Sequence, residues 1–362
     1  MIQLNDINMD FDIKQINERQ RVILSFFDFN IELSISDVFE KIQKDFSGVS
    51  KLTIGRDLKR LVECNFLARK GAGRSVVYTL SPKYVLVRTI DTEKYFTKTQ
   101  DERVIQTQFN FNIFETLKSG VFTKAEKEKL EVLHNKFQTK FESIKSDTLT
   151  SKEFERIMIE FSWKSSQIEG NTYSLLDTEL LIKENKKAEG KTEAETSMIL
   201  NHKEIFEYVL NNRQDFTVLT LAKLEHIHSV LTKGLGIPRN LRKAPVGITG
   251  TNYKPLDNVF QIEEAVEKMI DLVNNKNDFF EKSFLCLVLL SYIQPFEDGN
   301  KRTARMASNA ILLAHNTTPI SYRAVNEVEY KKASLLFYEI NNLSYFKEVF
   351  LKQYEFAVEN YF

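Results

Sequence analysis

Residues 294–305, QPFEDGNKRTAR, combine a tight turn with several charged side chains. Gly299 and Asn300 come at the expected start of a helix, where free backbone N–H groups and the positive end of the helix dipole attract anions. Arg302 and Arg305 lie about one turn apart on that helix and add positive charge. The stretch therefore predicts an anion site, and phosphate is the expected anion.

Asp298 adds a carboxylate at the edge of this turn, and Lys301 adds a further cation. Mg²⁺ usually binds one or two carboxylates together with phosphate oxygens, so Asp298 is the candidate metal ligand. The pattern thus predicts a cradle for a nucleotide with its Mg²⁺. The alternative is a loop whose charges only pair with one another.

The sequence around the turn predicts two helices that hold it. Residues 283–293 are apolar on almost every side, which is typical of a helix in the middle of a core. Pro295 and Gly299 interrupt the helical pattern, and residues 302–313 resume it. We therefore expect the turn to join a buried helix to a second helix.

A second candidate motif lies at the end of a helix expected over residues 151–168. The chain there reads SSQIEGN from Ser165, and Gly170 is expected to stop the helix. Glu169 stands at the negative end of the helix dipole, which is mildly unfavourable for a carboxylate. Some contact that compensates Glu169 is therefore expected.

These two motifs resemble those of the Fic (Fido) domain family. The family's signature loop is His-x-Phe-x-(Asp/Glu)-Gly-Asn-(Gly/Lys)-Arg-x-x-Arg, and its inhibitory motif is (Ser/Thr)-x-x-x-Glu-(Gly/Asn). Their order along this chain is similar to that of the class with an intramolecular inhibitory helix. The matching residues are Phe296, Asp298, Gly299, Asn300, Lys301, Arg302 and Arg305 in the first motif, and Ser165, Glu169 and Gly170 in the second.

The resemblance implies a mainly α-helical domain that transfers AMP from Mg²⁺-ATP to a hydroxyl of a protein, either a target or the chain itself. In the family the inhibitory glutamate pairs with the second arginine of the signature. Glu169 is thus expected to hold Arg305 and to block the place of the γ-phosphate. The other implied roles are Mg²⁺ binding for Asp298, phosphate binding for Gly299, Asn300, Lys301, Arg302 and Arg305, and anchoring of the loop in the core for Phe296.

Gln294 departs from the pattern, because the family has histidine at this position. The resemblance implies that this histidine is the general base for the hydroxyl that attacks the α-phosphate of ATP. A glutamine amide accepts no proton near pH 7, and loss of a positioned base typically lowers a rate by ~10²–10⁴. We therefore expect AMP transfer to be weak or absent, whereas nucleotide binding need not suffer. The sequence leaves open whether Gln294 is a natural or an engineered replacement.

Residues 246–255 alternate β-branched residues with glycine and turn residues, which predicts a short β-hairpin. The stretch resembles the family's flap, which lies over the active site and aligns a target segment by strand addition. The alternative is an ordinary surface hairpin. The flap residues expected at the site are Gly247, Ile248, Thr249 and Gly250.

His226 and His228 lie two residues apart on a helix expected over residues 220–232, so they face different ways. Neither has a partner at a spacing typical of metal ligands. Both are interpreted as structural residues.

The N-terminal part predicts three short helices followed by a hairpin at residues 66–80 with a basic tip. The third helix is expected to begin after Ser50, with Leu52, Leu58, Leu61 and Val62 on its inner face. This order of elements resembles a winged helix-turn-helix, which we expect to occupy residues 1–90.

Residues 50–74 contain seven basic and two acidic residues, whereas the 50 basic and 50 acidic residues of the whole chain cancel. Such a local excess suits contacts with DNA phosphates from a recognition helix and a wing. The alternative is a protein-interaction module with a solvated basic face. The residues expected at the DNA are Thr53, Arg56, Lys59, Arg60 and Arg74.

Composition limits the remaining possibilities. A chain of 362 residues with 42 % hydrophobic content suits two or three domains, and its two cysteines argue for a reducing compartment, so we expect a cytoplasmic location without a membrane partner. The first residues lack the pattern of a signal peptide. The polar stretch 91–104 is the expected linker, and residues 105–362 are the expected Fic-type domain, with its inhibitory helix near 151–169.

The sequence therefore leaves two hypotheses for the function. The first is an autoinhibited protein adenylyltransferase that uses ATP and Mg²⁺. The second is a non-catalytic transcriptional regulator in which ATP occupancy biases DNA binding by the winged helix. The sequence leaves the target protein, the DNA and any homo-oligomer open.

Overall fold

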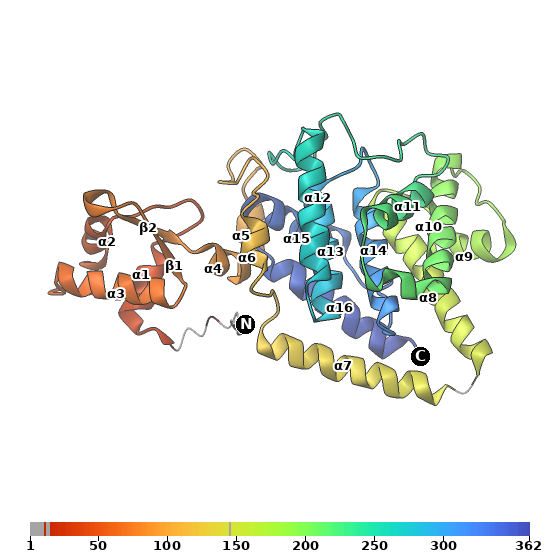
Figure 1. Cartoon of the computed structure of the whole chain (residues 1–362), viewed down its shortest axis with the longest axis horizontal. Helices are drawn as coiled ribbons and strands as arrows, with labels where there is room; N and C mark the ends of the chain where they lie inside the picture. Colours follow the sequence, from red (N-terminus) through yellow and green to blue (C-terminus); the bar gives the residue numbers. More distant parts are fainter. Residues whose placement is uncertain (1–10, 12–14, 145) are drawn as a thin grey trace.

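The computed structural model describes residue 11, residues 15–144 and residues 146–362. The expectations for residues 1–10, namely the missing signal peptide and the beginning of the first domain, lie outside this part. Figure 1 shows a small N-terminal unit at one end of an elongated molecule and a larger helical body at the other. Each has its own hydrophobic core. The prediction of a mainly α-helical chain is confirmed.

The described N-terminal unit consists of three helices and a hairpin, as predicted. The two strands pair antiparallel, with Leu67 opposite Leu80 and Lys70 opposite Val77. A 3-10 turn at Gly73–Ser75 forms the tip between them. The elements are α1 Glu18–Ser25, α2 Ile35–Ile42, α3 Lys51–Glu63, β1 Leu67–Lys70 and β2 Val77–Leu80.

Helix α3 begins where Ser50 predicts, because the Ser50 side chain accepts a hydrogen bond from the N–H of Thr53. Its buried face differs from the prediction. Leu52 is 67 % exposed, whereas Ile54, Leu58 and Leu61 are fully buried. These three residues repeat at helical spacing on one face, and Leu52 lies outside it.

The stretch 91–104, expected to be a linker, packs on the helical body. It contains the short helix α5, Thr92–Phe96. Arg103 pairs with Glu339 at 2.9 Å, and both side chains are almost completely buried. Tyr95 donates a hydrogen bond to the same carboxylate at 2.7 Å. The stretch is therefore fixed to the body and does not only span the distance between the two parts.

Helix α13 lies at the centre of the body, where it packs against α12, α14 and α15 (Figure 1). Every residue from Ser283 to Ile293 is buried, which confirms the predicted core helix before the turn. The helices of the junction and body are α4 Pro82–Val87, α6 Ile113–Leu117, α7 Lys124–Ser143, α8 Asp147–Ile168, α9 Leu175–Glu184, α10 Glu193–Asn211, α11 Leu221–Leu231, α12 Val259–Asn274, α13 Phe279–Ile293, α14 Asn300–Ala314, α15 Glu327–Ile340 and α16 Ser344–Asn360.

The hairpin predicted over residues 246–255 does not form. Thr249 and Gly250 make a turn, but in the described chain the only regular sheet is β1–β2. Lys254 pairs instead with Gln108 in an isolated bridge, and the Tyr253 hydroxyl donates to the carbonyl of Tyr292 at 3.1 Å. Tyr253 and Lys254 thus bond to other segments of the body and not to the residues before the turn. We keep the name flap for residues 246–250.

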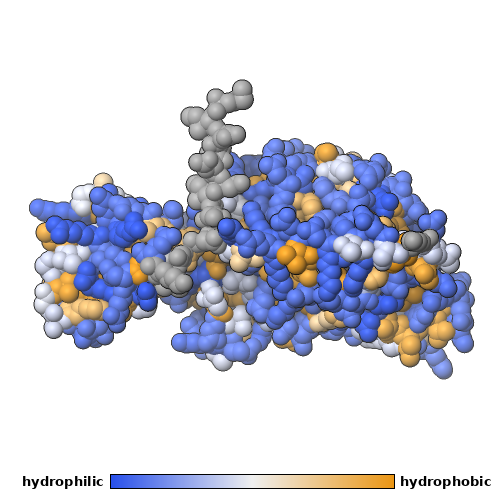
Figure 2. Space-filling view, turned by 90° about the horizontal axis from the view of Figure 1, so that it is seen from below, coloured by the Kyte–Doolittle hydropathy of each residue, from blue (hydrophilic) through white to orange (hydrophobic). Residues whose placement is uncertain are grey.

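No helix in the described ranges combines the length and the apolar character that a membrane span requires. Figure 2 shows one face of the molecule, on which hydrophobic side chains form small separate patches on a mostly hydrophilic surface.

Candidate active site

Two residues with positive φ shape the turn between α13 and α14. Gln294 ends α13 with φ 52°, and Gly299 precedes α14 with φ 77°. A Cβ at Gly299 would lie 3.0 Å from Cγ2 of Thr232, so the turn needs glycine for its backbone and for this close approach. Asn300 closes the turn, because its side chain accepts from the N–H of Phe296 and donates to the carbonyl of Phe296, both at 2.8 Å.

Phe296 fixes the turn to α11. Its ring is fully buried and stacks on the imidazole of His228, with centroids 3.8 Å apart and planes 6° apart. His228 Nε2 donates to the carbonyl of Asp298 at 3.0 Å. Burial lowers the pKa of His228, which favours the neutral ring. His228 therefore supports the turn directly, whereas His226 lies against Tyr208.

Arg242 ties the flap region to the start of the turn. It is 1 % exposed, its Nε donates to the carbonyl of Gln294 at 2.6 Å, and its Nη1 donates to the carbonyl of Ala244 at 2.9 Å. Its Nη2 donates to the carbonyl of Leu256, and its backbone N–H donates to the carbonyl of Pro295 at 2.9 Å. No local sequence pattern singles out this arginine, since its partners lie up to 52 positions away.

The side chain of Gln294 is turned back toward α13. Its Nε2 donates to the carbonyl of Ser291 at 2.6 Å, and the residue is only 8 % exposed. The amide at this position thus acts as a donor to the main chain, and it has no basic atom to offer a hydroxyl.

The C-terminal end of α8 meets α14 through Glu169. One carboxylate oxygen lies 2.9 Å from Nη2 of Arg305, and the other lies 3.9 Å from Nζ of Lys301. Arg305 is fully buried, whereas the Glu169 side chain is 21 % exposed. Burial raises the pKa of Glu169, but the charges of Arg305 and Lys301 outweigh that effect and lower it. The ionised carboxylate therefore compensates the buried guanidinium.

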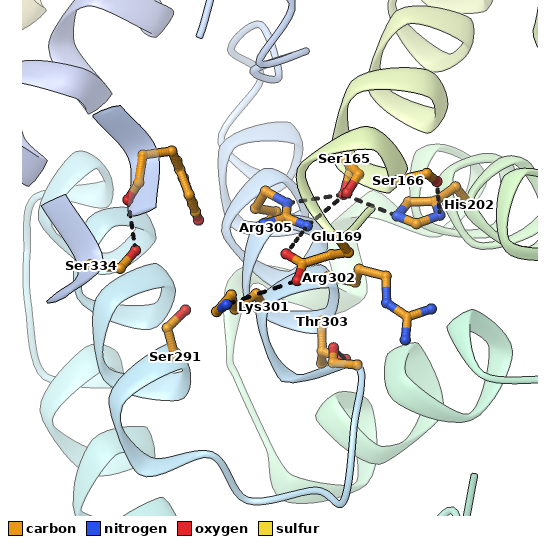
Figure 3. Close-up of polar contacts among 12 residues, drawn as sticks. Ser165, Ser166, Glu169, His202, Ser291, Lys301, Arg302, Thr303, Arg305 and Ser334 are labelled. Carbon is orange, nitrogen blue, oxygen red and sulfur yellow. Dashed lines mark hydrogen bonds and ion pairs between the residues drawn. The ribbon is translucent and has the colours of Figure 1, made fainter. Parts of the chain in front are cut away.

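Ser165 and His202 extend this contact (Figure 3). Arg305 Nε donates to the hydroxyl of Ser165, and Arg305 Nη2 donates to its carbonyl, both at 2.9 Å. His202 Nδ1 lies 2.8 Å from the carbonyl of Met198, so Nδ1 carries the hydrogen and Nε2 accepts from the Ser165 hydroxyl at 3.0 Å. Burial lowers the pKa of His202 to about 3, which keeps the ring neutral. No local sequence pattern predicts that His202 contacts Ser165.

A cavity of about 500 Å³ lies over the turn. It collects most of the predicted residues of the nucleotide site, the inhibitory motif and the flap, from three separate segments. Arg302 and Arg305 are not among its described lining residues: Arg305 lies behind Glu169, and Arg302 points away from the Glu169 carboxylate (Figure 3). The predicted residues that line it are Glu169, Gly170, Gly247, Ile248, Thr249, Gly250, Gln294, Asp298, Gly299, Asn300 and Lys301.

The cavity residues fit a nucleotide with Mg²⁺. No described side chain caps α14, so its first N–H groups remain for phosphate oxygens. Nη1 of the buried Arg302 has no hydrogen-bond partner in the part of the chain that the structure describes. The Asp298 side chain is 71 % exposed. Among the described residues, no three His, Cys, Asp or Glu side chains gather to hold a metal. Mg²⁺ usually shares phosphate oxygens with one or two carboxylates, and Asp298 offers one.

The residues expected at DNA lie apart from this cavity, on the N-terminal unit. Arg56, Lys59 and Arg60 are exposed on α3, and Arg74 is exposed at the hairpin tip. Thr53 is half-buried near the start of α3.

Residues 218–312 match the model of the Fic/DOC family. This part of the chain contains α11, α12, α13, the turn and most of α14. The match does not extend to α8 and Glu169.

Three curated relatives bear names of protein adenylyltransferases. A probable protein adenylyltransferase of Aquifex aeolicus is 28 % identical over 108 residues, which are 29 % of this chain and 33 % of that protein. Protein adenylyltransferase Fic of Nematostella vectensis is 29 % identical over 177 residues, or 46 % and 40 % of the two chains. Protein adenylyltransferase fic-1 of Caenorhabditis briggsae is 23 % identical over 246 residues, or 64 % and 46 %. This chain thus spans less than half the length of each relative.

Solved structures share the fold. A Fic-1 structure from C. elegans superposes with a TM-score of 0.57 at 14 % identity, over 89 % of this chain and 90 % of that chain. A Fic family protein from Desulfovibrio desulfuricans gives 0.57 at 20 % identity, over 66 % and 74 %.

Proposed function

We propose that this chain is a Fic-type protein adenylyltransferase that binds Mg²⁺-ATP, is autoinhibited by Glu169, and has weak or no AMP transfer because Gln294 stands at the position of the base. The observation that carries the proposal is the 2.9 Å contact between Glu169 and the fully buried Arg305, at the edge of the cavity over the turn. The names of the relatives support AMP transfer as the reaction.

The groups of this chain suit binding of the triphosphate better than catalysis of AMP transfer. The free N–H groups at the start of α14 and the Lys301 ammonium would face phosphate oxygens, and Asp298 would hold Mg²⁺, which adds positive charge beside them. Arg305 joins them only when Glu169 moves aside. In the reaction a protein hydroxyl would attack the α-phosphate and pyrophosphate would leave, so the hydroxyl proton needs an acceptor. Gln294 supplies none.

The test compares four proteins incubated with Mg²⁺-ATP: the chain as given, Glu169→Gly, Gln294→His and the double variant. AMP incorporation is read from the intact mass of each protein. We expect labelling in the double variant, little in Gln294→His, and none in the other two. A double variant that binds ATP but carries no AMP would contradict a self-modifying transferase.

A second function, DNA binding by the N-terminal unit acting as a winged helix, is favoured by the outer face of α3. Asp57, an acidic residue in the middle of this basic helix, is turned inward, where Arg19 pairs with it at 2.6 Å. The exposed face therefore keeps Arg56 and Arg60 without that acidic neighbour. Positive charge on one helix face suits phosphate contacts.

The DNA hypothesis is tested by gel shift with duplex DNA at several salt concentrations, with and without ATP. We expect Arg56→Ala/Arg60→Ala to weaken binding and to reduce its salt dependence. Lys186→Ala/Lys243→Ala removes two exposed cations of the body and serves as the control. Equal binding by both double variants would rule out α3 as the contact, and binding that ignores ATP would rule out nucleotide sensing.

A further inference from the structure

A second cavity, of about 670 Å³, lies at the junction between the N-terminal unit and the body. It shares no described lining residue with the cavity over the turn. Its walls come from α1 and the chain after it, from α4 and α5, and from residues 98–104. Both its volume and its place between two packed parts are typical of small-molecule sites.

The lining of this junction cavity combines apolar groups with an excess of cations. Leu24, Phe27 and Leu80 form buried apolar wall, and Tyr84 and Tyr95 add aromatic rings. The charged lining residues are Arg21, Arg88, Lys94, Lys98, Arg103, Asp28 and Asp91.

Both carboxylates at the cavity already have partners. Asp28 pairs with Arg88 at 2.5 Å, and Asp91 accepts the backbone N–H of Lys94 at 3.0 Å. The Lys94 and Lys98 side chains, in contrast, form no ion pair with any described residue, and both residues are exposed. The lining has five cations against two carboxylates, and Glu339 pairs with one of the five, Arg103, so the cavity keeps an excess of positive charge.

Two arginines at this cavity are also incompletely bonded. The side chains of Arg88 and Arg103 are 15 % and 6 % exposed. The buried Nε of each has no hydrogen-bond partner among the described residues. Buried donors of this kind are normally satisfied, so a ligand or water is expected to complete them.

We propose that the junction cavity binds a small carboxylate with an aromatic body. The apolar wall with its tyrosine rings takes the body, and the arginines and lysines take the carboxylate. Charged donors suit this part because their hydrogen bonds to a carboxylate are short and strong.

Arg103 connects the junction cavity to the flap. Its Nη2 donates to the carbonyl of Gly250 at 2.5 Å and pairs with Glu339 at 2.9 Å. Gly250 in turn lines the cavity over the turn. A carboxylate that draws on the Arg103 guanidinium therefore changes how firmly the flap is held.

The experiment uses the full chain and two fluorescent ligands, 2-naphthoate and its neutral analogue 2-naphthylmethanol. We expect the carboxylate to bind at least tenfold more tightly than the alcohol. Lys94→Glu/Lys98→Glu, which alters exposed side chains only, is expected to weaken 2-naphthoate binding at least tenfold. The control Lys44→Glu/Lys186→Glu makes the same charge change at exposed residues outside the described cavities, and should leave affinity within twofold.

No binding of 2-naphthoate, equal binding of the alcohol, or equal loss in the two double variants would overturn the site. Hydrogen exchange of residues 246–252, measured with and without saturating 2-naphthoate, tests the link to the flap. A change in the exchange rate of these amides supports the link, and unchanged rates at full occupancy overturn it. Neither measurement depends on AMP transfer.

Discussion

His202 decides which way the hydroxyl of Ser165 points. Because His202 Nε2 accepts the Ser165 hydrogen, the Ser165 oxygen is free to accept from Arg305 Nε. The three side chains thus form one directional chain of hydrogen bonds that ends at the carbonyl of Met198. Hydrogen bonds in such buried networks make the side chains more rigid, and an unpaired buried polar group is costly.

We expect His202→Phe to lower the free energy of unfolding by about 1–3 kcal/mol, because it keeps a ring beside Phe161 but leaves the Ser165 hydroxyl without its acceptor. His202→Gln retains an acceptor and a donor, so its loss should be clearly smaller. Urea unfolding of both variants measures the difference. Equal losses would show that ring packing, and not the hydrogen bond, is what His202 contributes.

Among the single residues of the site, the sequence predicts those that belong to short motifs and misses their distant partners. Glu169, Asp298 and Gly299 are found because their neighbours fix their spacing. His202 and Arg242 act through atoms that lie 37 and 52 positions away. No local pattern contains that information, and His228 is identified only as structural, without its contact to the turn.

The turn between α13 and α14 depends on one glycine, Gly299. Gly299→Ala would place a Cβ 3.0 Å from Thr232 in a left-handed backbone conformation. We expect the free energy of unfolding to fall by about 2–4 kcal/mol, which is the sum of the cost of the left-handed backbone and the cost of the close contact with Thr232. Thermal or urea unfolding measures it.

Gly236→Ala is the matched control, because Gly236 has φ 72° and no atom within 4 Å of an added Cβ. This substitution should lower the free energy of unfolding only by the cost of the left-handed backbone, about 1–2 kcal/mol. If both substitutions cost the same, the close approach to Thr232 is not important for the turn.

Elements differ from their sequence predictions where a partner from another element intervenes. On α3 the buried face includes Asp57, which pattern alone assigns to solvent, because Arg19 and Gln20 of α1 bond to it. In the flap region the alternating pattern predicts a hairpin, but Lys254 pairs with Gln108 instead. The helices around the turn are predicted well, since their apolar periodicity is strong and local.

Residues 91–104, which lie between the N-terminal unit and the body, are fixed to the body by a buried ion pair. Arg103 and Glu339 are 6 % and 1 % exposed, so removing one partner leaves a buried charge. We expect Arg103→Met to cost about 3–5 kcal/mol, and Arg103→Met/Glu339→Met to cost clearly less. Chemical unfolding of both variants provides the comparison.

Lys268→Met serves as the control for this pair, because Lys268 and Glu264 form an exposed pair with side chains 48 % and 53 % accessible. Such pairs contribute at most about 1 kcal/mol. An Arg103→Met variant that unfolds like Lys268→Met would contradict a structural role for the buried pair. The polar composition of residues 91–104 predicts a linker, and composition alone does not reveal Glu339 as a partner of Arg103.

We propose that Glu169 occupies the Arg305 guanidinium that would otherwise bind a nucleotide. Calorimetric titration of Mg²⁺-ATP into the chain as given and into Glu169→Gln tests this claim, since the amide keeps the shape of the side chain but removes its charge. We predict at least a tenfold gain in affinity, which corresponds to about 1.4 kcal/mol, because Arg305 is then free to meet phosphate. Equal affinities in two folded proteins would contradict the claim.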